Sequence, residues 1–144
     1  MKLIDLNLLI YAVNRDAPCH AAACRWWEEC LSNTDPIGLA WAVILGFLRI
    51  TTHTRVMPHP LTAEQALDLM DDWLRQPVVH VVLPTDRHWD IFRQLVEPLG
   101  TAGNLMMDAH LAALAIEHGA TLYSTDIDFS RFRMLKTINP LGSP

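Results

Sequence analysis

The chain has 144 residues, the length of one globular domain, and half of them are apolar, so a hydrophobic core is expected without disulfides. A net charge of −5 argues against a protein that coats nucleic acid non-specifically, although carboxylates awaiting a metal ion would add negative charge of their own. The longest apolar run, from Ile37 to Leu48, is too short for a membrane span, and the N-terminus lacks the pattern of a signal peptide. We therefore expect a soluble, cytoplasmic protein with a single domain over residues 1–144.

The first third of the chain is predicted to contain one strand and two helices. Residues 3–4 form a short apolar strand that ends at Asp5, and residues 6–14 follow as a helix. Asp16 is expected to cap a second helix, which runs to about Leu31. A strand followed directly by a helix is the usual beginning of an α/β fold.

The middle of the chain is predicted to add two helices and a strand. Residues 40–52 are apolar nearly all round, which predicts a helix that is buried and also lies in an oligomer interface. Thr62 and Gln65 have the spacing of a capping box, and the helix that they open is expected to end at Pro77. Residues 78–83 are apolar without alternation, which is typical of a parallel strand covered on both faces.

The last third is predicted to contain two helices and two short strands. Thr85 caps a helix that closes at Gly100, and residues 104–118 form another. Residues 121–124 form a short buried strand, and residues 134–138 a last strand at the sheet edge. This alternation predicts a three-layer α/β/α sandwich around a central, mainly parallel sheet.

Three aspartates are expected to meet at one edge of that sheet. Asp5 and Asp126 each follow a strand, and the carboxyl ends of parallel strands share the edge at which α/β proteins bind ligands. Asp108 lies near the start of its helix on the stripe that faces the sheet, whereas His110 lies on the opposite, outer face. A buried carboxylate needs a partner, and no lysine or arginine stands beside these three in the sequence. The pattern predicts a site for Mg²⁺ or Mn²⁺.

A divalent ion held by these acids would activate water and stabilise a leaving oxygen, so phosphodiester hydrolysis is the reaction expected. Each acid also has a structural interpretation. Asp5 could cap the following helix, Asp108 could face the helix dipole, and Asp126 and Asp128 could be turn residues. All of them being structural at one sheet edge is the less favoured explanation.

Two segments resemble the PIN domains of VapC toxins. These are IDLNLLIYA, which contains the first acid, and GNLMMDAHLAALAIEHGATLYSTDIDF, which contains the other acids in order. The resemblance covers the chain from Met1 to about Pro140. It implies a PIN-like fold and a cytoplasmic, Mg²⁺-dependent endoribonuclease that is the toxin of a type II toxin–antitoxin system. It also implies a homodimer, an antitoxin partner and an RNA substrate.

The resemblance assigns the residues of the site one by one. It implies that Asp5, Asp108 and Asp126 are catalytic metal ligands and that Asp128 is an auxiliary ligand. Asn7 and Ser124 fall at positions where such domains place supporting polar side chains.

One position departs from the family pattern. Most PIN domains have a glutamate on the helix after the second strand, in a segment such as LAEFLR, whereas here the matching segment is LGFLR and Gly46 replaces the acid. We therefore expect the second metal position to be weakened, with Asp128 or a substrate phosphate compensating. The alternative is a PIN module that binds RNA or a partner with little or no catalysis. A phosphatase with a nucleophilic aspartate is disfavoured, because the strand end reads Asp5-Leu6-Asn7 rather than Asp-x-Asp.

Arginines and tryptophans suggest further contacts. Arg131 and Arg133 follow the Asp126 loop closely and are the best candidates for contacts to the RNA backbone. Among the five tryptophans, those at positions 41, 73 and 89 lie on predicted apolar faces and are expected in the core. Trp26 and Trp27 are adjacent, so only one of them is expected to face inward.

Overall fold

A parallel sheet forms the centre of the computed structural model, which describes residues 1–142. Within these residues the sheet has five strands in the order β3-β2-β1-β4-β5, and every neighbouring pair is parallel. The strands are β1 (Lys2–Ile4), β2 (Ile37–Ala40), β3 (Val79–Val82), β4 (Thr121–Tyr123) and β5 (Thr137–Ile138). This confirms the predicted parallel α/β architecture.

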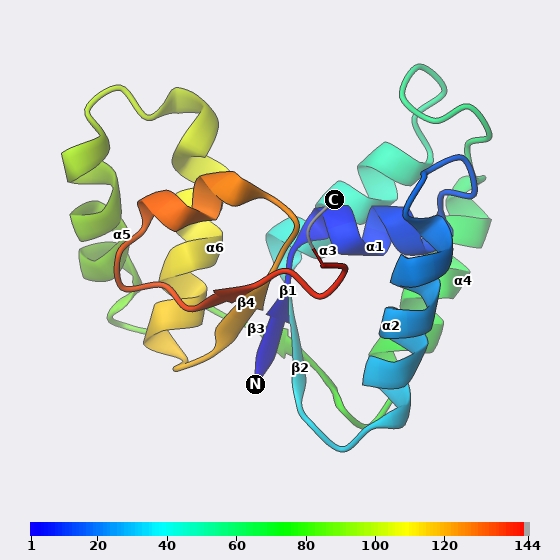
Figure 1. Ribbon diagram of the computed structural model, residues 1–144, viewed down its shortest axis with the longest axis horizontal. Coiled ribbons are helices and arrows are strands. Elements are labelled where there is room, and N and C mark those ends of the chain that lie inside the picture. The colour runs from blue at the N-terminus through cyan, green and yellow to red at the C-terminus, as the bar shows by residue number, and fades with distance from the viewer. Residues whose placement is uncertain (143–144) are drawn as a thin grey trace.

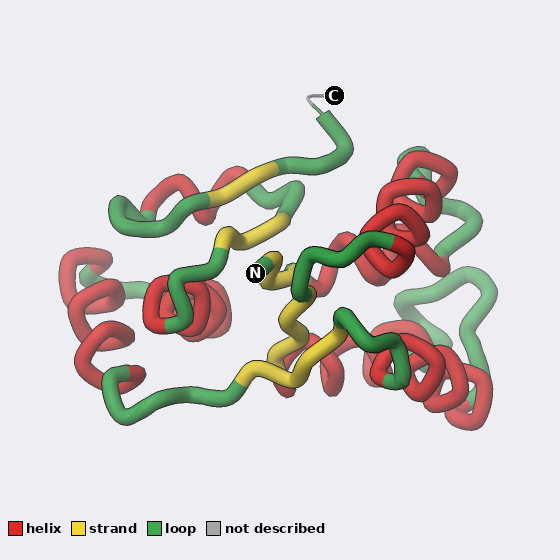
Figure 2. The backbone as a smooth tube through the Cα atoms, turned by 90° about the horizontal axis from the view of Figure 1, so that it is seen from below, coloured by secondary structure: helices red, strands yellow, loops and turns green. Residues whose placement is uncertain are grey.

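Helices cover both faces of the sheet. They are α1 (Leu6–Val13), α2 (His20–Ser32), α3 (Trp41–Thr51), α4 (Ala63–Leu74), α5 (His88–Val96) and α6 (Met106–Glu117), with short 3₁₀ helices η1 (Glu97–Leu99), η2 (Gly103–Leu105) and η3 (Ile127–Arg131). Helices α5 and α6 lie on one side of the strands, and α1, α2 and α4 lie on the other (Figures 1 and 2). Within residues 1–142, none of the helices has the length and apolar character needed to cross a membrane.

The capping box at the start of α4 is confirmed. The Thr62 hydroxyl accepts a hydrogen bond from the Gln65 backbone at 3.1 Å, and the Gln65 side chain accepts one from the Thr62 backbone at 3.0 Å. These reciprocal bonds satisfy two backbone donors that the first turn of a helix otherwise leaves unpaired.

The prediction for the start of the second helix is wrong. Helix α2 begins at His20, and Asp16 lies in the preceding turn, where its backbone donates to the Asn14 side chain at 3.1 Å. The carboxylate of Asp16 instead contacts His59 at 3.0 Å. Aspartate is a residue type that often caps a helix, but Asp16 lies in the turn after α1, before the residue at which α2 begins.

The prediction that residues 78–83 are covered on both faces is also wrong. Strand β3 is an edge strand paired with β2, and Val81 and Leu83 are 37% and 56% exposed. Its apolar composition does not show which strand lies at the edge, because strand order depends on how the connecting helices pack.

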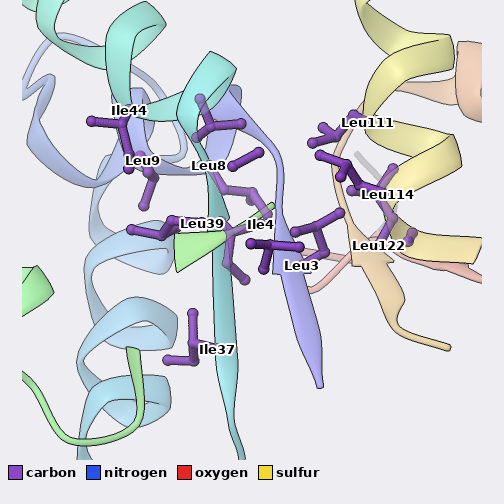
Figure 3. Packing of buried hydrophobic residues seen from close by; sticks show 14 of the residues in the cluster. Leu3, Ile4, Leu8, Leu9, Ile37, Leu39, Ile44, Leu111, Leu114 and Leu122 are labelled. Carbon is purple, nitrogen blue, oxygen red and sulfur yellow. The ribbon is translucent and has the colours of Figure 1, made fainter. Parts of the chain in front are cut away.

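The hydrophobic core occupies both faces of β1. Figure 3 shows Leu9, Leu39 and Ile44 on one side of that strand, with Leu111 and Leu122 on the other. The side chains in Figure 3 join the sheet to both helical layers, so the end of β1 is held from both sides.

The tryptophans divide between core and surface. Trp27 and Trp73 are buried, with rings 5.5 Å apart in an edge-to-face arrangement, so only one of the adjacent pair faces inward as expected. Trp41 and Trp89 are 52% and 66% exposed, which contradicts their predicted place in the core. Both lie in the first turn of their helices, Trp41 as the first residue of α3 and Trp89 as the second residue of α5.

Candidate functional site

Asp5 and Ser124 lie side by side at the carboxyl edge of the sheet. Strands β1 and β4 are neighbours, with Ile4 opposite Tyr123, so the residues that follow them leave the sheet together. The backbone N–H of Asp5 donates to the Tyr123 carbonyl at 3.0 Å, which fixes the direction in which α1 begins. The sheet register therefore places the first acid beside the loop that contains the last two.

A chain of hydrogen bonds links Asp5 to that loop. Asp5 accepts one bond from the backbone of Leu6 at 2.8 Å and another from the Ser124 hydroxyl at 2.6 Å. The Ser124 oxygen accepts from the Asp126 backbone at 2.9 Å, and the Asp126 carboxylate accepts from the Asp128 backbone at 2.8 Å. Asp5 and Asp126 are thus caps of α1 and η3. The structural interpretation of these acids is correct, but it does not exclude ligand binding, because a carboxylate accepts about four hydrogen or metal bonds.

Asp108 lies in the first turn of α6 and completes the carboxylate cluster. Burial, and then the neighbouring charges of Asp126, Asp5 and Asp128 in that order of size, raise its pKa to about 6. The pKa of Asp5 is also raised, chiefly by burial and slightly by Asp126, while its hydrogen bonds from Ser124 and Leu6 act in the opposite direction. The charges of Asp5, Asp126 and Asp128 thus lie near enough to Asp108 to act on it.

The cluster has little cationic compensation. Across residues 1–142, its one ion pair joins Asp128 to Arg131, with a separation of 3.9 Å. Uncompensated carboxylates at partly buried positions favour a divalent cation, and oxygen donors suit Mg²⁺ and Mn²⁺. The donor set therefore fits the expected metal.

The side chains are not arranged as a finished metal site. Among the described residues, no three histidine, cysteine, aspartate or glutamate side chains converge at ligand distance. Asp126 has one oxygen bonded to the Asp128 backbone, and Asp5 has both oxygens engaged. Metal binding at this site would therefore require the carboxylates to move closer together.

Gly46 has a packing role that the sequence does not reveal. It is buried in α3, and a Cβ atom built on it would lie 2.7 Å from the Cδ2 atom of Leu6, the residue directly after Asp5. A side chain at position 46 would therefore meet the first turn of α1. Leu6 fills the space beside the cluster, and no carboxylate enters it from α3.

His110 lies on the face of α6 away from the sheet, as predicted, and there it packs against α5 and is only partly exposed. Its Nδ1 atom lies 2.9 Å from Nε2 of His88 on α5, and Nδ1 of His88 lies 2.6 Å from the Glu117 carboxylate. Glu117 also accepts from the Thr85 backbone at 2.7 Å, and its side chain is fully buried. This network joins α5 to α6 on the side away from the sheet. His88 and Glu117 lie 29 residues apart in the chain, so no local motif could have indicated the network.

The other predicted residues divide between the carboxylate cluster and the exposed surface. Ser124 contacts Asp5 as expected of a supporting residue, whereas Asn7 is exposed. Arg131 and Arg133 are exposed and line a groove between α5 and the segment after η3. The predicted acids thus gather at one edge with Ser124 among them, whereas Arg131 ends η3 and Arg133 follows it.

Comparison with known proteins agrees with this architecture. The model of the PIN domain family matches residues 2–134. The chain is 43% identical over 140 residues to "Ribonuclease VapC37" of Mycobacterium tuberculosis, covering 97% of each chain. It is 42% identical over 141 residues to "Ribonuclease VapC33" of the same organism, covering 98% of this chain and 99% of that one.

A solved structure shows the same fold. VapBC2 from Rickettsia felis, bound to a DNA fragment from their promoter, aligns with a TM-score of 0.71 at 20% identity over 96% of this chain and 97% of that one. Fold, family model and full-length relatives agree, and the chain belongs to the PIN domain family and, within it, to the VapC group.

Proposed function

We propose that the chain is a Mg²⁺-dependent endoribonuclease and the toxin of a type II toxin–antitoxin system. The observation that carries this proposal is the cluster of Asp5, Asp108, Asp126 and Asp128 at the carboxyl edge of the sheet. Its support from outside the structure is that relatives 42–43% identical over nearly their full length are named ribonucleases. We place the activity in the cytoplasm, where cellular RNA is the substrate.

The residues of the site would have different roles in binding the metal ion and the RNA. Asp5 is held in one orientation by two hydrogen bonds, so it provides a fixed ligand. Asp108 and Asp126 repel each other, and this repulsion would disfavour an RNA phosphate until a divalent cation is bound. When bound, Mg²⁺ or Mn²⁺ supplies a nucleophilic water at neutral pH and stabilises charge on the leaving oxygen.

The first experiment is a cleavage assay with purified protein, a structured mixed-sequence RNA, and either Mg²⁺, Mn²⁺ or EDTA. We expect discrete internal cuts that need the metal and leave a 5′-phosphate on the downstream fragment. RNA that is bound but left intact in every condition would contradict catalysis, and a binding module without nuclease activity would then replace the proposal.

A supporting role for Ser124 can be tested separately. Ser124→Ala removes the 2.6 Å hydrogen bond to Asp5 and also the acceptor for the Asp126 backbone, so both ligands lose their orientation. Loss of such a partner typically weakens metal binding or activity by about 10- to 100-fold. We expect a loss of this size in Mn²⁺ affinity by isothermal titration calorimetry, and a similar loss in cleavage.

Ser130→Ala is the matched control, because Ser130 is exposed in η3 and takes no part in the bonds that orient Asp5. It should retain wild-type metal affinity. Equal behaviour of the two variants would show that the hydroxyl of Ser124 does not orient the ligands.

We further propose that the protein forms a homodimer and binds a cognate antitoxin. Support comes from its relatives named VapC, from the fold shared with VapBC2, and from exposed Trp41 and Leu45, which lie one turn apart on α3. Large apolar side chains exposed together are typical of protein interfaces. Light scattering on the purified protein, with and without its antitoxin, measures both associations.

A further inference from the structure

A groove lies between α5 and the segment that follows η3. It has a volume of about 820 Å³, within the usual range for sites that hold small organic ligands. Its rim contains Arg87, Arg131 and Arg133, with Asp90 as the one acidic residue of the lining. The rest of the lining, which we call the floor of the groove, is mainly apolar and includes Ile116 of α6.

The charge of this groove is opposite to that of the chain as a whole. Three arginines face one aspartate here, whereas the whole chain has a net charge of −5. Arg131 is 59% exposed at its side chain and has a distant partner in Asp128 at 3.9 Å, so its guanidinium retains free donors. Guanidinium groups bind phosphates through paired N–H donors, so a phosphodiester backbone fits this rim.

The groove approaches the carboxylate cluster at Arg131, which lines it and whose Nε atom lies 3.9 Å from an oxygen of Asp128. Helix η3 begins directly after Asp126 and ends at Arg131, and its five residues span about 10 Å at the usual rise of a 3₁₀ helix. Figure 1 shows this segment, in orange, running from the end of β4 towards α5. A strand cut at the carboxylates must continue on both sides of the cut, and a groove beside the cluster is placed to receive one of the two continuations.

The floor of the groove suits the bases of such a strand. Met134 is 71% exposed, and Leu95 and Leu99 are partly exposed along the same groove. Enzymes that act on nucleic acids hold unstacked bases against apolar and aromatic side chains. Arginine around an apolar floor therefore matches a single strand with phosphates at the rim and bases inside.

We propose that this groove binds the single-stranded RNA that flanks the scissile phosphodiester, an inference that rests on the proposed nuclease function. Arg87 and Arg133 bind backbone phosphates, and Arg131 joins the groove to the active site. RNA affinity would then depend on residues well outside the carboxylate cluster.

The test compares a double variant, Arg87→Ala with Arg133→Ala, against Arg93→Ala. Arg93 lies on α5, which Arg87 immediately precedes, and is exposed, but it pairs with Glu97 and is outside the groove. Binding of a fluorescent random-sequence RNA and of a labelled dinucleotide is measured in the Asp108→Asn background at several NaCl concentrations and fixed Mg²⁺. Wild-type cleavage is measured in parallel, and circular dichroism checks the fold of each variant.

Log affinity falls as log salt rises, and removing one phosphate-binding arginine should make this negative slope shallower by about 0.7 for a single strand. The double variant should therefore have a slope that is shallower by about 1.4. The dinucleotide should bind equally to all proteins, and Arg93→Ala should behave as its parent.

Equal slopes for the double variant and Arg93→Ala, while the wild type still cleaves RNA, would overturn the groove assignment alone. The same holds if the double variant keeps the RNA affinity of its parent at every salt concentration. A wild type that neither cleaves nor binds RNA would overturn the proposed function, and the groove assignment with it.

Discussion

Asp108→Asn should abolish metal-dependent RNA cleavage and, without metal, should make the folded protein more stable at neutral pH. Loss of a charged ligand for a catalytic metal removes electrostatic stabilisation that is typically worth about 100-fold or more in rate. The same substitution removes a carboxylate whose pKa is raised to about 6 by burial and by Asp126, Asp5 and Asp128. Activity and stability should therefore change in opposite directions.

The pH dependence follows from the direction of that shift. Because the folded state raises the pKa of Asp108 from 3.8 to about 6, the stability from this group is complete below about pH 4 and is lost as the pH rises through 6. The whole shift would correspond to about 3 kcal/mol, but solvent screening of a partly exposed group reduces our expectation to about 1 kcal/mol. Urea unfolding in EDTA should show Asp108→Asn more stable than the wild type at pH 7.5 and equal to it at pH 4.

Metal provides the control for this prediction. Mg²⁺ should raise the free energy of unfolding of the wild type and should raise that of Asp108→Asn much less, because a ligand that binds only the folded state stabilises it. A variant that is less stable than the wild type at pH 7.5 in EDTA would show that Asp108 is stabilised by its surroundings, and would argue against an uncompensated carboxylate cluster.

Phe47→Ala should cause the largest loss of stability among the substitutions considered. Phe47 is fully buried on α3, and its ring lies 4.9 Å from that of Trp73 on α4. Removing a buried phenylalanine side chain typically lowers the free energy of unfolding by about 3–5 kcal/mol, a large part of the about 5–15 kcal/mol of a whole domain. Far-UV circular dichroism during urea unfolding measures this without depending on tryptophan fluorescence.

Leu67→Ala is the comparison for Phe47→Ala, since Leu67 is 51% exposed on α4. Its effect should stay within about 0.5 kcal/mol. If Phe47→Ala lowered the free energy of unfolding by less than about 1.5 kcal/mol, Trp73 or its neighbours would have moved into the space, and the contact between α3 and α4 would be more adaptable than its packing indicates.

Much of the candidate site could be predicted because its geometry is local to strand ends. Asp5 follows β1 and Asp126 follows β4, and parallel strands place such residues at one edge whatever the rest of the fold does. Asp108 was predictable from the stripe of its helix that faces the sheet. These inferences needed periodicity and strand ends, but no knowledge of the side chains across the interface.

The features that could not be predicted depend on contacts between distant segments. The edge position of β3, the exposure of Trp41 and Trp89, and the contact of His88 with Glu117 all depend on how the helices pack. An apolar face shows that a helix buries something, but not how far along the helix the cover extends. The groove that contains Arg87 could not be inferred for the same reason, because it joins α5 to a segment more than one helix away in the chain.

The contact between Gly46 and Leu6 has a consequence for the evolution of this site. A glutamate introduced at position 46 would place its Cβ atom 2.7 Å from the Cδ2 atom of Leu6, so the end of that flexible side chain would have to move. Shortening Leu6 first would leave a cavity beside α3, which is destabilising. The two positions should therefore be coupled, because the conformation that Leu6 adopts depends on the side chain at position 46. A carboxylate can return to position 46 only if Leu6 moves, so the composition of this candidate site depends on packing as well as on chemistry.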